Sequence, residues 1–308
     1  MTTQSVVKNN EQNNQNIWYR KMRIKMICNW TNPKNLCDEW SIMCKHRYKW
    51  NDIEITWRDD NIDFFVIINM PYSNEYYDPA KTLVFQMEPW WAVSEWEVWA
   101  KPDPTKFLFV GSHQNILNVV QLHIAVPKSF PEVRHDKLVA IVSDNSQPDG
   151  HKKRLNFVRK LEEKNILLVD VYGRSNYHGF RGYCGKVPQE NKAECFRQYK
   201  YCLQAENTEE FNYATEKIWE PIVCETLAFY WGCPNLETYL NPLCYVRLDL
   251  DDIDGSLQII QTAIVENWWE QRINIIREEK NKILNELGFF PMLEKKCKEL
   301  SQGGNIDI

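Results

Sequence analysis

The chain lacks any long apolar segment and any strong excess of charge of one sign. No apolar run approaches the roughly 20 residues that span a bilayer, and no apolar signal-peptide segment follows the first methionine. The net charge is −5, so no overall positive field is present to hold nucleic acid or an anionic membrane. We therefore expect a cytoplasmic or soluble protein without a membrane span or a nucleic-acid partner, in which any phosphate is bound by local groups.

The sequence also lacks the cysteine patterns of a zinc site. Its ten cysteines are scattered, with no C-x-x-C pair and no Cys/His spacing typical of zinc. Four of them lie in or beside apolar segments, where free buried thiols are expected: Cys28, Cys202, Cys224 and Cys244. This usage favours a reducing compartment.

The length and composition suit two domains of ordinary size. The chain has 308 residues, of which 44% are hydrophobic, so it can bury a substantial core. Residues 1–17 are rich in Asn and Gln without apolar periodicity and predict a disordered tail. The segment 126–135 holds two prolines and no clear period, which places the boundary there. We expect an N-terminal domain at 18–130 and a C-terminal domain with terminal helices at 131–308.

Strand and helix patterns alternate in both halves, which predicts an α/β protein. The first half predicts a helix near 35–45 and strands near 22–28, 52–57, 63–69 and 82–87. The second half predicts strands at 137–143, 167–172, 199–204, 227–231 and 244–248, and helices at 151–163, from 215, and between 256 and 300. Mostly parallel sheets covered on both sides follow, with ligands beyond the carboxyl ends of the strands of two Rossmann-like halves.

One segment has the pattern of a phosphate-binding loop. Residues 199–235, YKYCLQAENTEEFNYATEKIWEPIVCETLAFYWGCPN, predict a strand, a polar loop, a helix and a strand. Four side chains lie around the loop that opens the helix: Asn207, Tyr213, Glu216 and Lys217. Backbone N–H groups at a helix start face an anion, the helix dipole favours it, and Lys217 adds a full charge. This arrangement suits a nucleotide diphosphate.

The same segment resembles the donor-binding region of the α1,3/4-fucosyltransferases, glycosyltransferase family 10. The resemblance rests on A-E-N-T at 205–208, Y-A-T-E-K at 213–217, Y-W-G-C-P-N at 230–235 and N-P at 241–242. Residues 141–173 are similar to the start of that family's donor domain, where an Arg opens a helix. That Arg matches Arg154, with Lys153 as a competing neighbour.

A further resemblance lies in the first half. The strand TLVFQMEPWW at 82–91 is similar to the family's strand ending in E-S-P, whose Glu acts as general base, and the matching residue is Glu88. Trp90 and Trp91 follow directly, and aromatic faces pack well against sugars, so they are candidates for an acceptor platform. The alternative is that these tryptophans pack in the core or between domains.

The resemblance implies a GT-B fold, with two Rossmann-like domains facing each other across a cleft. The acceptor domain would be residues 18–130, and the GDP-sugar-binding domain would be residues 131–308. It implies an inverting enzyme that transfers fucose from GDP-fucose to a hydroxyl of a glycan acceptor, in α1,3 linkage, with no obligatory metal or other cofactor. Glu88 would take the proton from the acceptor hydroxyl. Arg154 and Lys217 would meet the charge on the β-phosphate. Asn207, Tyr213 and Glu216 would hold ribose, base or fucose hydroxyls.

Departures from the family pattern leave alternatives open. Pro221 interrupts the helix after the loop, and residues 224–228 replace a segment that usually carries Gly and Pro. These changes spare the phosphate ligands but affect the sugar pocket. A scaffold using another GDP-sugar, or a non-catalytic glycan- or nucleotide-sugar-binding protein, is therefore also possible. The D-x-D pattern at Asp249 and Asp251 is interpreted as an acidic strand end without a metal, and residues 179–186 are predicted to form a loop.

Overall fold

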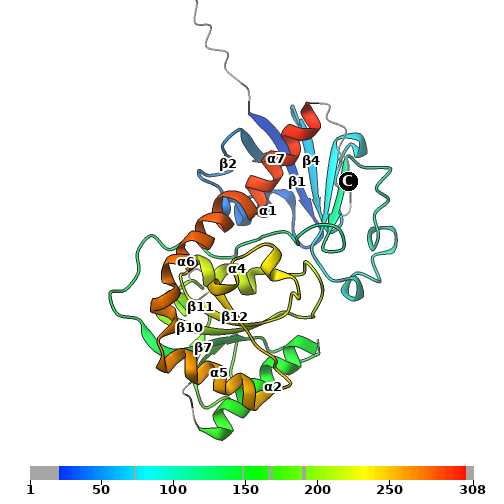
Figure 1. Ribbon diagram of the computed structural model, residues 1–308. Coiled ribbons are helices and arrows are strands. Elements are labelled where there is room, and N and C mark those ends of the chain that lie inside the picture. Colours follow the sequence, from blue (N-terminus) through cyan, green and yellow to red (C-terminus); the bar gives the residue numbers. More distant parts are fainter. Residues whose placement is uncertain are drawn as a thin grey trace, which may run out of the picture.

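The computed structural model describes residues 21–302 apart from positions 73, 148, 166, 168 and 189–191. The tail predicted at 1–17 lies outside the described residues. The described chain forms two six-stranded sheets, which belong to the upper and lower halves of the molecule in Figure 1. This agrees with the expected α/β architecture. Among the described residues, no helix is both long enough and apolar enough to cross a membrane.

The first sheet has the strand order β2-β3-β1-β4-β5-β6, and all its neighbours are parallel except the antiparallel pair β2 and β3. Its strands are β1 (Met22–Cys28), β2 (Lys49–Trp50), β3 (Ile53–Thr56), β4 (Phe64–Ile68), β5 (Thr82–Gln86) and β6 (Phe109–Ser112). All five residues of β5 are buried, as expected for an inner parallel strand. Helix α1 (Pro33–Trp40) follows β1 and begins where the Asn32 side chain accepts a hydrogen bond from the Asn35 N–H.

The second sheet is fully parallel, with the order β12-β11-β10-β7-β8-β9. Its strands are β7 (His135–Val142), β8 (Val169–Gly173), β9 (Tyr183–Lys186), β10 (Tyr199–Ala205), β11 (Leu227–Trp231) and β12 (Tyr245–Arg247). Its helices are α2 (Asp149–Lys164), α3 (Glu194–Arg197), α4 (Glu216–Val223), α5 (Ile253–Val265) and α6 (Trp268–Lys282). If β7 is counted as the first strand, this is the strand order of a Rossmann fold. Ligands of such a fold bind at the carboxyl ends of its two central strands, here β7 and β10, where the strand order reverses.

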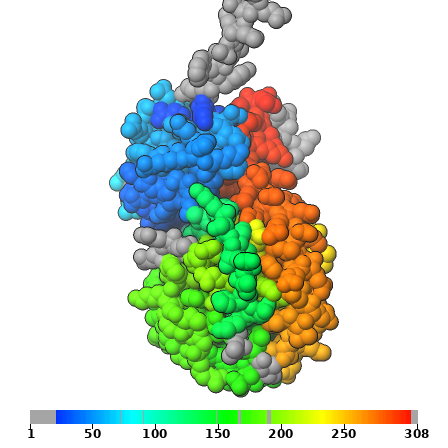
Figure 2. All heavy atoms as spheres, turned by 90° about the vertical axis from the view of Figure 1, so that its left-hand side faces the viewer, coloured from blue at the N-terminus to red at the C-terminus, as the bar shows by residue number. Residues whose placement is uncertain are grey.

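The end of the chain returns to the first domain. After α6, a π-helical segment (Ile283–Leu287) leads into α7 (Phe289–Ser301). Phe289 and Leu293 of α7 lie in the core cluster of the first sheet, and the ring of Phe289 packs edge-on against Trp40. Figure 2 shows this orange-to-red chain rising along one side of the molecule. The expected placement of all terminal helices in the domain 131–308 therefore does not hold for α7, because its apolar face covers the first sheet.

The prediction of a loop at 179–186 is wrong for Tyr183–Lys186, which form the edge strand β9. This strand pairs with β8 alone and has few apolar side chains, so its sequence pattern is weak. The prediction of buried thiols is confirmed, because the following cysteines are free and buried: Cys28, Cys202, Cys224 and Cys244.

Candidate functional site

A cavity of about 580 Å³ lies between the two domains. On the first domain its wall includes Trp30, Asn69 and Glu88, which follow the carboxyl ends of β1, β4 and β5. On the second domain it includes Asn207, just after β10, and the first turn of α4. The carboxyl ends of both parallel sheets therefore face the same space, which is where open α/β sheets bind ligands.

A smaller chamber of about 290 Å³ continues from this cavity into the second domain. The two spaces share Asn207, Glu216 and Lys217 in their walls. The chamber also reaches Ser143 after β7 and Arg154 in α2, so it lies at the point where the strand order of the second sheet reverses. Four of the five donor-binding residues predicted from the sequence line this chamber: Arg154, Asn207, Glu216 and Lys217.

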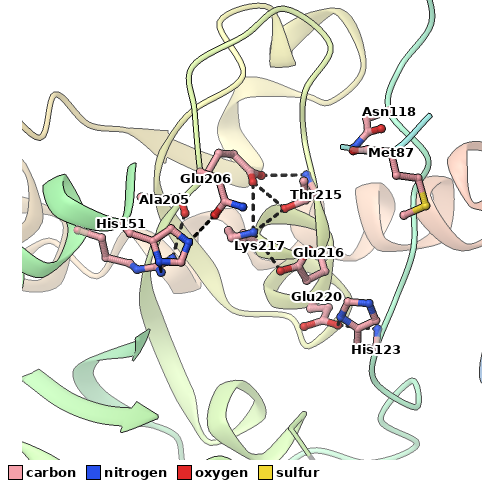
Figure 3. A network of polar contacts seen from close by, with 12 residues as sticks. Met87, Asn118, His123, His151, Ala205, Glu206, Thr215, Glu216, Lys217 and Glu220 are labelled. Atoms are coloured by element: carbon pink, nitrogen blue, oxygen red, sulfur yellow. Dashed lines mark hydrogen bonds and ion pairs between the residues drawn. The ribbon is translucent and has the colours of Figure 1, made fainter. Parts of the chain in front are cut away.

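Helix α4 is anchored at its start by a buried carboxylate, Glu206, shown in Figure 3. The backbone N–H of Thr215 donates to Glu206 Oε1 at 2.8 Å and its hydroxyl donates to Oε2 at 2.6 Å. The hydroxyl of Tyr230 on β11 donates to Oε1 at 3.1 Å. Burial raises the pKa of Glu206, and the nearby Lys217 offsets part of this effect. Glu206 thus ties the loop before α4 to two strands of the sheet.

Two glycines leave the space that Glu206 needs. Gly232 has φ +147°, and a Cβ there would lie 2.4 Å from Glu206 Cγ. A Cβ on Gly150 would lie 1.7 Å from the carbonyl oxygen of Glu206. The glycine in the W-G turn and the glycine at the start of α2 are therefore required by close packing around one residue.

Lys217 stays a cation because two carboxylates surround it. Its Nζ lies 3.0 Å from Glu216 Oε1 and 3.6 Å from Glu206 Oε2, and its side chain is 14% exposed. Burial favours the neutral amine, but Glu216 and Glu206 outweigh burial and raise the pKa of Lys217. Burial likewise opposes ionisation of Glu216, but Lys217 and Lys192 outweigh it, so the pKa of Glu216 lies well below its ordinary value.

Arg154 is the buried cation of the chamber, with 3% of its surface exposed. Its Nη1 donates to the carbonyl oxygen of Ala205 at 3.0 Å, whereas its Nε has no hydrogen-bond partner among the described residues. Burial lowers the pKa of Arg154, and Glu216 and Glu206 offset part of this. Lys153, the competing candidate, forms an ion pair with Asp251 instead. Arg154 therefore fits the predicted anion ligand better than Lys153 does.

Asn207 and Tyr213, the other residues predicted to bind the donor, contact side chains from other elements. The side-chain oxygen of Asn207 lies 2.7 Å from His151 Nε2 at the start of α2. Tyr213 is 2% exposed, lines the larger cavity, and packs edge-on against the ring of His113, with ring centroids 5.5 Å apart. Asn207 and Tyr213 thus both line the larger cavity, and their role in donor binding stays a prediction.

Glu88 lines the larger cavity on the first domain. The backbone that leads to it is fixed, because Met87 N–H donates to Asn69 Oδ1 at 2.9 Å and Asn118 Nδ2 donates to the Met87 carbonyl at 3.2 Å. No hydrogen bond or ion pair joins the Glu88 carboxyl to the described residues. Burial raises the pKa of Glu88, and Lys217 offsets part of the shift. A partly buried carboxyl without a partner is suited to accept a proton.

Trp91 and Asp251, two further residues considered from the sequence, do not line the larger cavity. Trp91 is 37% exposed and does not line the cavity, and the side chain of Trp90 is outside the described part of the chain. The tryptophans on the cavity wall are Trp30 and Trp40. Asp251 forms an ion pair with Lys153. The described residues include no cluster of three or more His, Cys, Asp or Glu that could hold a metal.

Sequence reasoning missed three buried polar groups at this site. Glu206 is part of the A-E-N-T string, and a polar residue directly after a buried strand was the available signal. Gln204 and Glu220 line the chamber and are 3% and 0% exposed. No motif marks them, because they lie within the apolar patterns of β10 and α4.

Two Rossmann-like domains whose parallel sheets meet at one cleft define a GT-B glycosyltransferase fold. A solved α1,3-fucosyltransferase with GDP has this fold, with a TM-score of 0.50, 18% identity, and coverage of 88% of this chain and 92% of that one. Residues 133–254 match the model of glycosyltransferase family 10 (fucosyltransferase), C-terminal part. The family resemblance predicted from the sequence is therefore confirmed for residues 133–254.

Curated relatives agree with this assignment. The α-(1,3)-fucosyltransferase FucT of Helicobacter pylori is 31% identical over 140 residues, which is 42% of this chain and 28% of that protein. The GDP-fucose protein O-fucosyltransferase 3 of Danio rerio is 22% identical over 197 residues, which is 61% of this chain and 42% of that protein. The chain thus spans less than half the length of these relatives.

Proposed function

We propose that this chain transfers fucose from GDP-fucose to a hydroxyl group of a glycan acceptor, in α1,3 linkage and with inversion at the anomeric carbon. The observation that carries the proposal is the buried guanidinium of Arg154. It has no carboxylate partner within ion-pair distance among the described residues, and it shares a chamber with Lys217 inside the segment that matches family 10. A buried cation without a partner is costly unless an anion joins it.

On the donor side, two cations and a helix start are available for the pyrophosphate. Arg154 and Lys217 would contact its oxygens, and the N-terminus of α4 would add its partial positive charge. These groups stabilise the charge that grows on the leaving GDP. Asn207, Tyr213 and Glu216 remain for the ribose, base or fucose hydroxyls. Because Arg154 and Lys217 supply the positive charge, we include in the proposal that no metal ion is obligatory.

On the acceptor side, Glu88 is the proposed general base. It removes the proton from the acceptor hydroxyl while that oxygen forms a bond to the anomeric carbon of fucose. The bond from that carbon to the β-phosphate oxygen breaks, and the electron pair leaves with GDP. The transition state is oxocarbenium-like, as in other glycosyl transfers. A single displacement from the face opposite GDP inverts the configuration.

A second candidate acceptor is a protein hydroxyl. The observation behind it is the match to a relative named as a GDP-fucose protein O-fucosyltransferase, which covers 61% of this chain. The donor chemistry would be unchanged, since the acceptor again supplies a hydroxyl to Glu88. The glycan acceptor is preferred because the relative with the higher identity, 31%, is an α-(1,3)-fucosyltransferase.

The test is a transfer assay with GDP-fucose and two acceptor panels, oligosaccharides and peptides that carry Ser or Thr. Mass spectrometry detects the added fucose, and NMR of the product gives the linkage. We expect fucose on an oligosaccharide in α1,3 linkage, and fucose on peptides alone would support the second candidate. Transfer from GDP-mannose but not from GDP-fucose would overturn the donor assignment.

A further inference from the structure

A mostly apolar pocket of about 310 Å³ lies outside the smaller chamber, where three segments that are distant in sequence meet. The segments are residues 42–50 of the first domain, residues 120–126 between the domains, and residues 283–291 at the start of α7. The interior side chains are apolar and buried: Trp50, Val120, Leu122, Ile283, Phe289 and Phe290. The volume lies at the lower end of the range of about 300–1,000 Å³ for small-molecule sites.

Contacts between these segments fix the shape of the apolar pocket. The N–H of Phe289 donates to the carbonyl oxygen of Val120 at 3.2 Å. The N–H of Leu122 donates to Met43 Sδ, also at 3.2 Å. The wall includes part of the π-helical segment Ile283–Leu287, a rare backbone form that is frequent at functional sites. The pocket is therefore preformed, as most ligand sites are.

The apolar pocket continues from the larger cavity, because Ile42 and Leu122 line both spaces. Glu88, the proposed base, lies on the wall of the larger cavity. An acceptor whose hydroxyl reaches Glu88 can thus extend past Ile42 and Leu122 into the pocket. Neither Arg154 nor Lys217 lines the pocket, so it is separate from the groups proposed to bind the donor phosphates.

The apolar interior selects the kind of molecule that the pocket can bind. A sugar unit would lose hydrogen bonds to water there without replacing them. An apolar cavity of about 150 Å³ already binds benzene, so this pocket has room for an aromatic ring or an alkyl chain. The charged side chain in its wall, Lys45, is exposed and already has partners. Its Nζ donates to Asn51 Oδ1 at 2.7 Å and lies 4.6 Å from the ring centroid of Trp50.

We propose that the apolar pocket holds an apolar aglycone at the reducing end of the acceptor, an inference that rests on the proposed function. The reducing end is the position through which a glycan is joined to a lipid chain or an aromatic group. Burial of such a group removes apolar surface of both partners from water. Each buried methylene group contributes about fourfold to affinity. The acceptor is thus a glycoconjugate whose sugar reaches Glu88 while its apolar part occupies the pocket.

The test measures fucose transfer to the methyl, phenyl and octyl glycosides of the oligosaccharide that accepts fucose best, all below their micelle-forming concentrations. We expect the KM of the octyl glycoside to be about 10- to 100-fold lower than that of the methyl glycoside, because two or three buried methylene groups suffice for this. A low KM for the phenyl glycoside alone would support an aromatic aglycone in the same pocket. Equal KM values for all three glycosides would overturn the inference.

Variants of the pocket wall test where the apolar group binds. Leu284 and Val126 are partly buried and line the apolar pocket but not the larger cavity. Leu284→Gln should raise the KM of the glycoside that wild type prefers about 10-fold, and leave the KM of the methyl glycoside and the affinity for GDP unchanged. Val126→Gln should act in the same way, and it applies if Leu284→Gln does not fold. Leu243→Gln, at an exposed leucine outside both spaces, is the matched control.

The outcomes separate this inference from the proposed function. If both pocket variants keep the wild-type preference for the octyl or phenyl glycoside, the apolar group binds elsewhere and the inference is wrong. Transfer to all three glycosides with equal KM values would overturn the inference and leave the proposed function standing. Absence of transfer to any oligosaccharide would instead overturn the proposed function, and this inference with it.

Discussion

Glu206 Oε2 and Lys217 Nζ lie 3.6 Å apart at the start of α4, with their side chains 0% and 14% exposed. Glu206 directly follows the strand β10, and Lys217 belongs to the first turn of the helix, so the pair joins the two ends of the loop at 206–215. Glu206 also holds Thr215 through its N–H and its hydroxyl. The loop is thereby fixed before a ligand arrives, which reduces the entropy lost on binding.

The anchoring role of Glu206 predicts a large loss of stability for Glu206→Ala. The change removes the acceptor of three hydrogen bonds and leaves Lys217 with one carboxylate neighbour fewer. We expect the free energy of unfolding to fall by about 3 kcal/mol or more. Urea unfolding measures it, with Glu209→Ala, an exposed neighbour, as the control. If both variants are equally stable, Glu206 is not the anchor.

The phosphate role of Lys217 predicts weaker binding of GDP by Lys217→Ala. Loss of one charge-assisted contact should raise the dissociation constant about 10- to 100-fold. Calorimetry with GDP measures this, after thermal unfolding has confirmed that the variant is folded. Lys152→Ala, an exposed lysine on α2, should bind GDP like wild type. An affinity of Lys217→Ala equal to that of wild type would remove Lys217 from the anion site.

The proposed base predicts a kinetic defect without a binding defect. Glu88→Gln should lower turnover by about 10²- to 10⁴-fold, the usual contribution of general base catalysis. Its affinity for GDP should stay near the wild-type value, because Glu88 does not line the smaller chamber that contains Arg154. Glu95→Gln, exposed a few residues later, is the matched control for the assay. Unchanged turnover of Glu88→Gln would exclude this carboxylate from proton transfer.

The environment of Glu88 also predicts the acid side of the pH profile. Burial raises the pKa of Glu88, with Lys217 as the opposing influence. A base acts in its deprotonated form, so kcat/KM should be full above this pKa and decline as the pH falls through it. The decline should therefore begin above the ordinary glutamate value of about 4.3. A profile whose acid limb lies at or below that value would contradict a buried base.

The two cations at the donor site predict activity without a divalent metal. In the proposed site, Arg154 and Lys217 would supply the positive charge that a metal ion could otherwise provide. Transfer rates should be equal before and after dialysis against EDTA, and added Mg²⁺ or Mn²⁺ should change them less than about twofold. Activity that is lost with EDTA and restored by Mn²⁺ would show that the cations are not sufficient.

The strands that position the site were predictable because their apolar runs are continuous. β1, β7, β10 and β11 lie where the sequence patterns predict them, and the motif residues after β10 converge on one chamber. The short edge strands β6 and β9 were not predicted, because each pairs on one side and includes glycine. Helical periodicity shows that α7 has an apolar face but not which sheet that face covers.

The sequence mispredicted or missed some residues of the site because their positions depend on how distant segments pack together. Trp91 follows Glu88 closely in sequence, but the chain turns after β5 and the residue stays away from the cavity. Trp30 is distant in sequence and reaches the cavity because β1 and β5 end at the same edge of the sheet. Gln204 and Glu220 are polar residues inside apolar patterns, and they line a chamber that the sequence does not reveal.

A thermal shift series with GDP-fucose, GDP-mannose, GDP and UDP-glucose tests most directly whether this chain binds a GDP-sugar donor. A ligand that binds the folded state alone stabilises it by about 2.7 kcal/mol at 100 times its dissociation constant. Such a gain should raise the melting temperature by several degrees. We expect GDP-fucose to give the largest shift, GDP a smaller one, and UDP-glucose none. A shift with UDP-glucose, or no shift with any GDP compound, would show that the donor is not GDP-fucose.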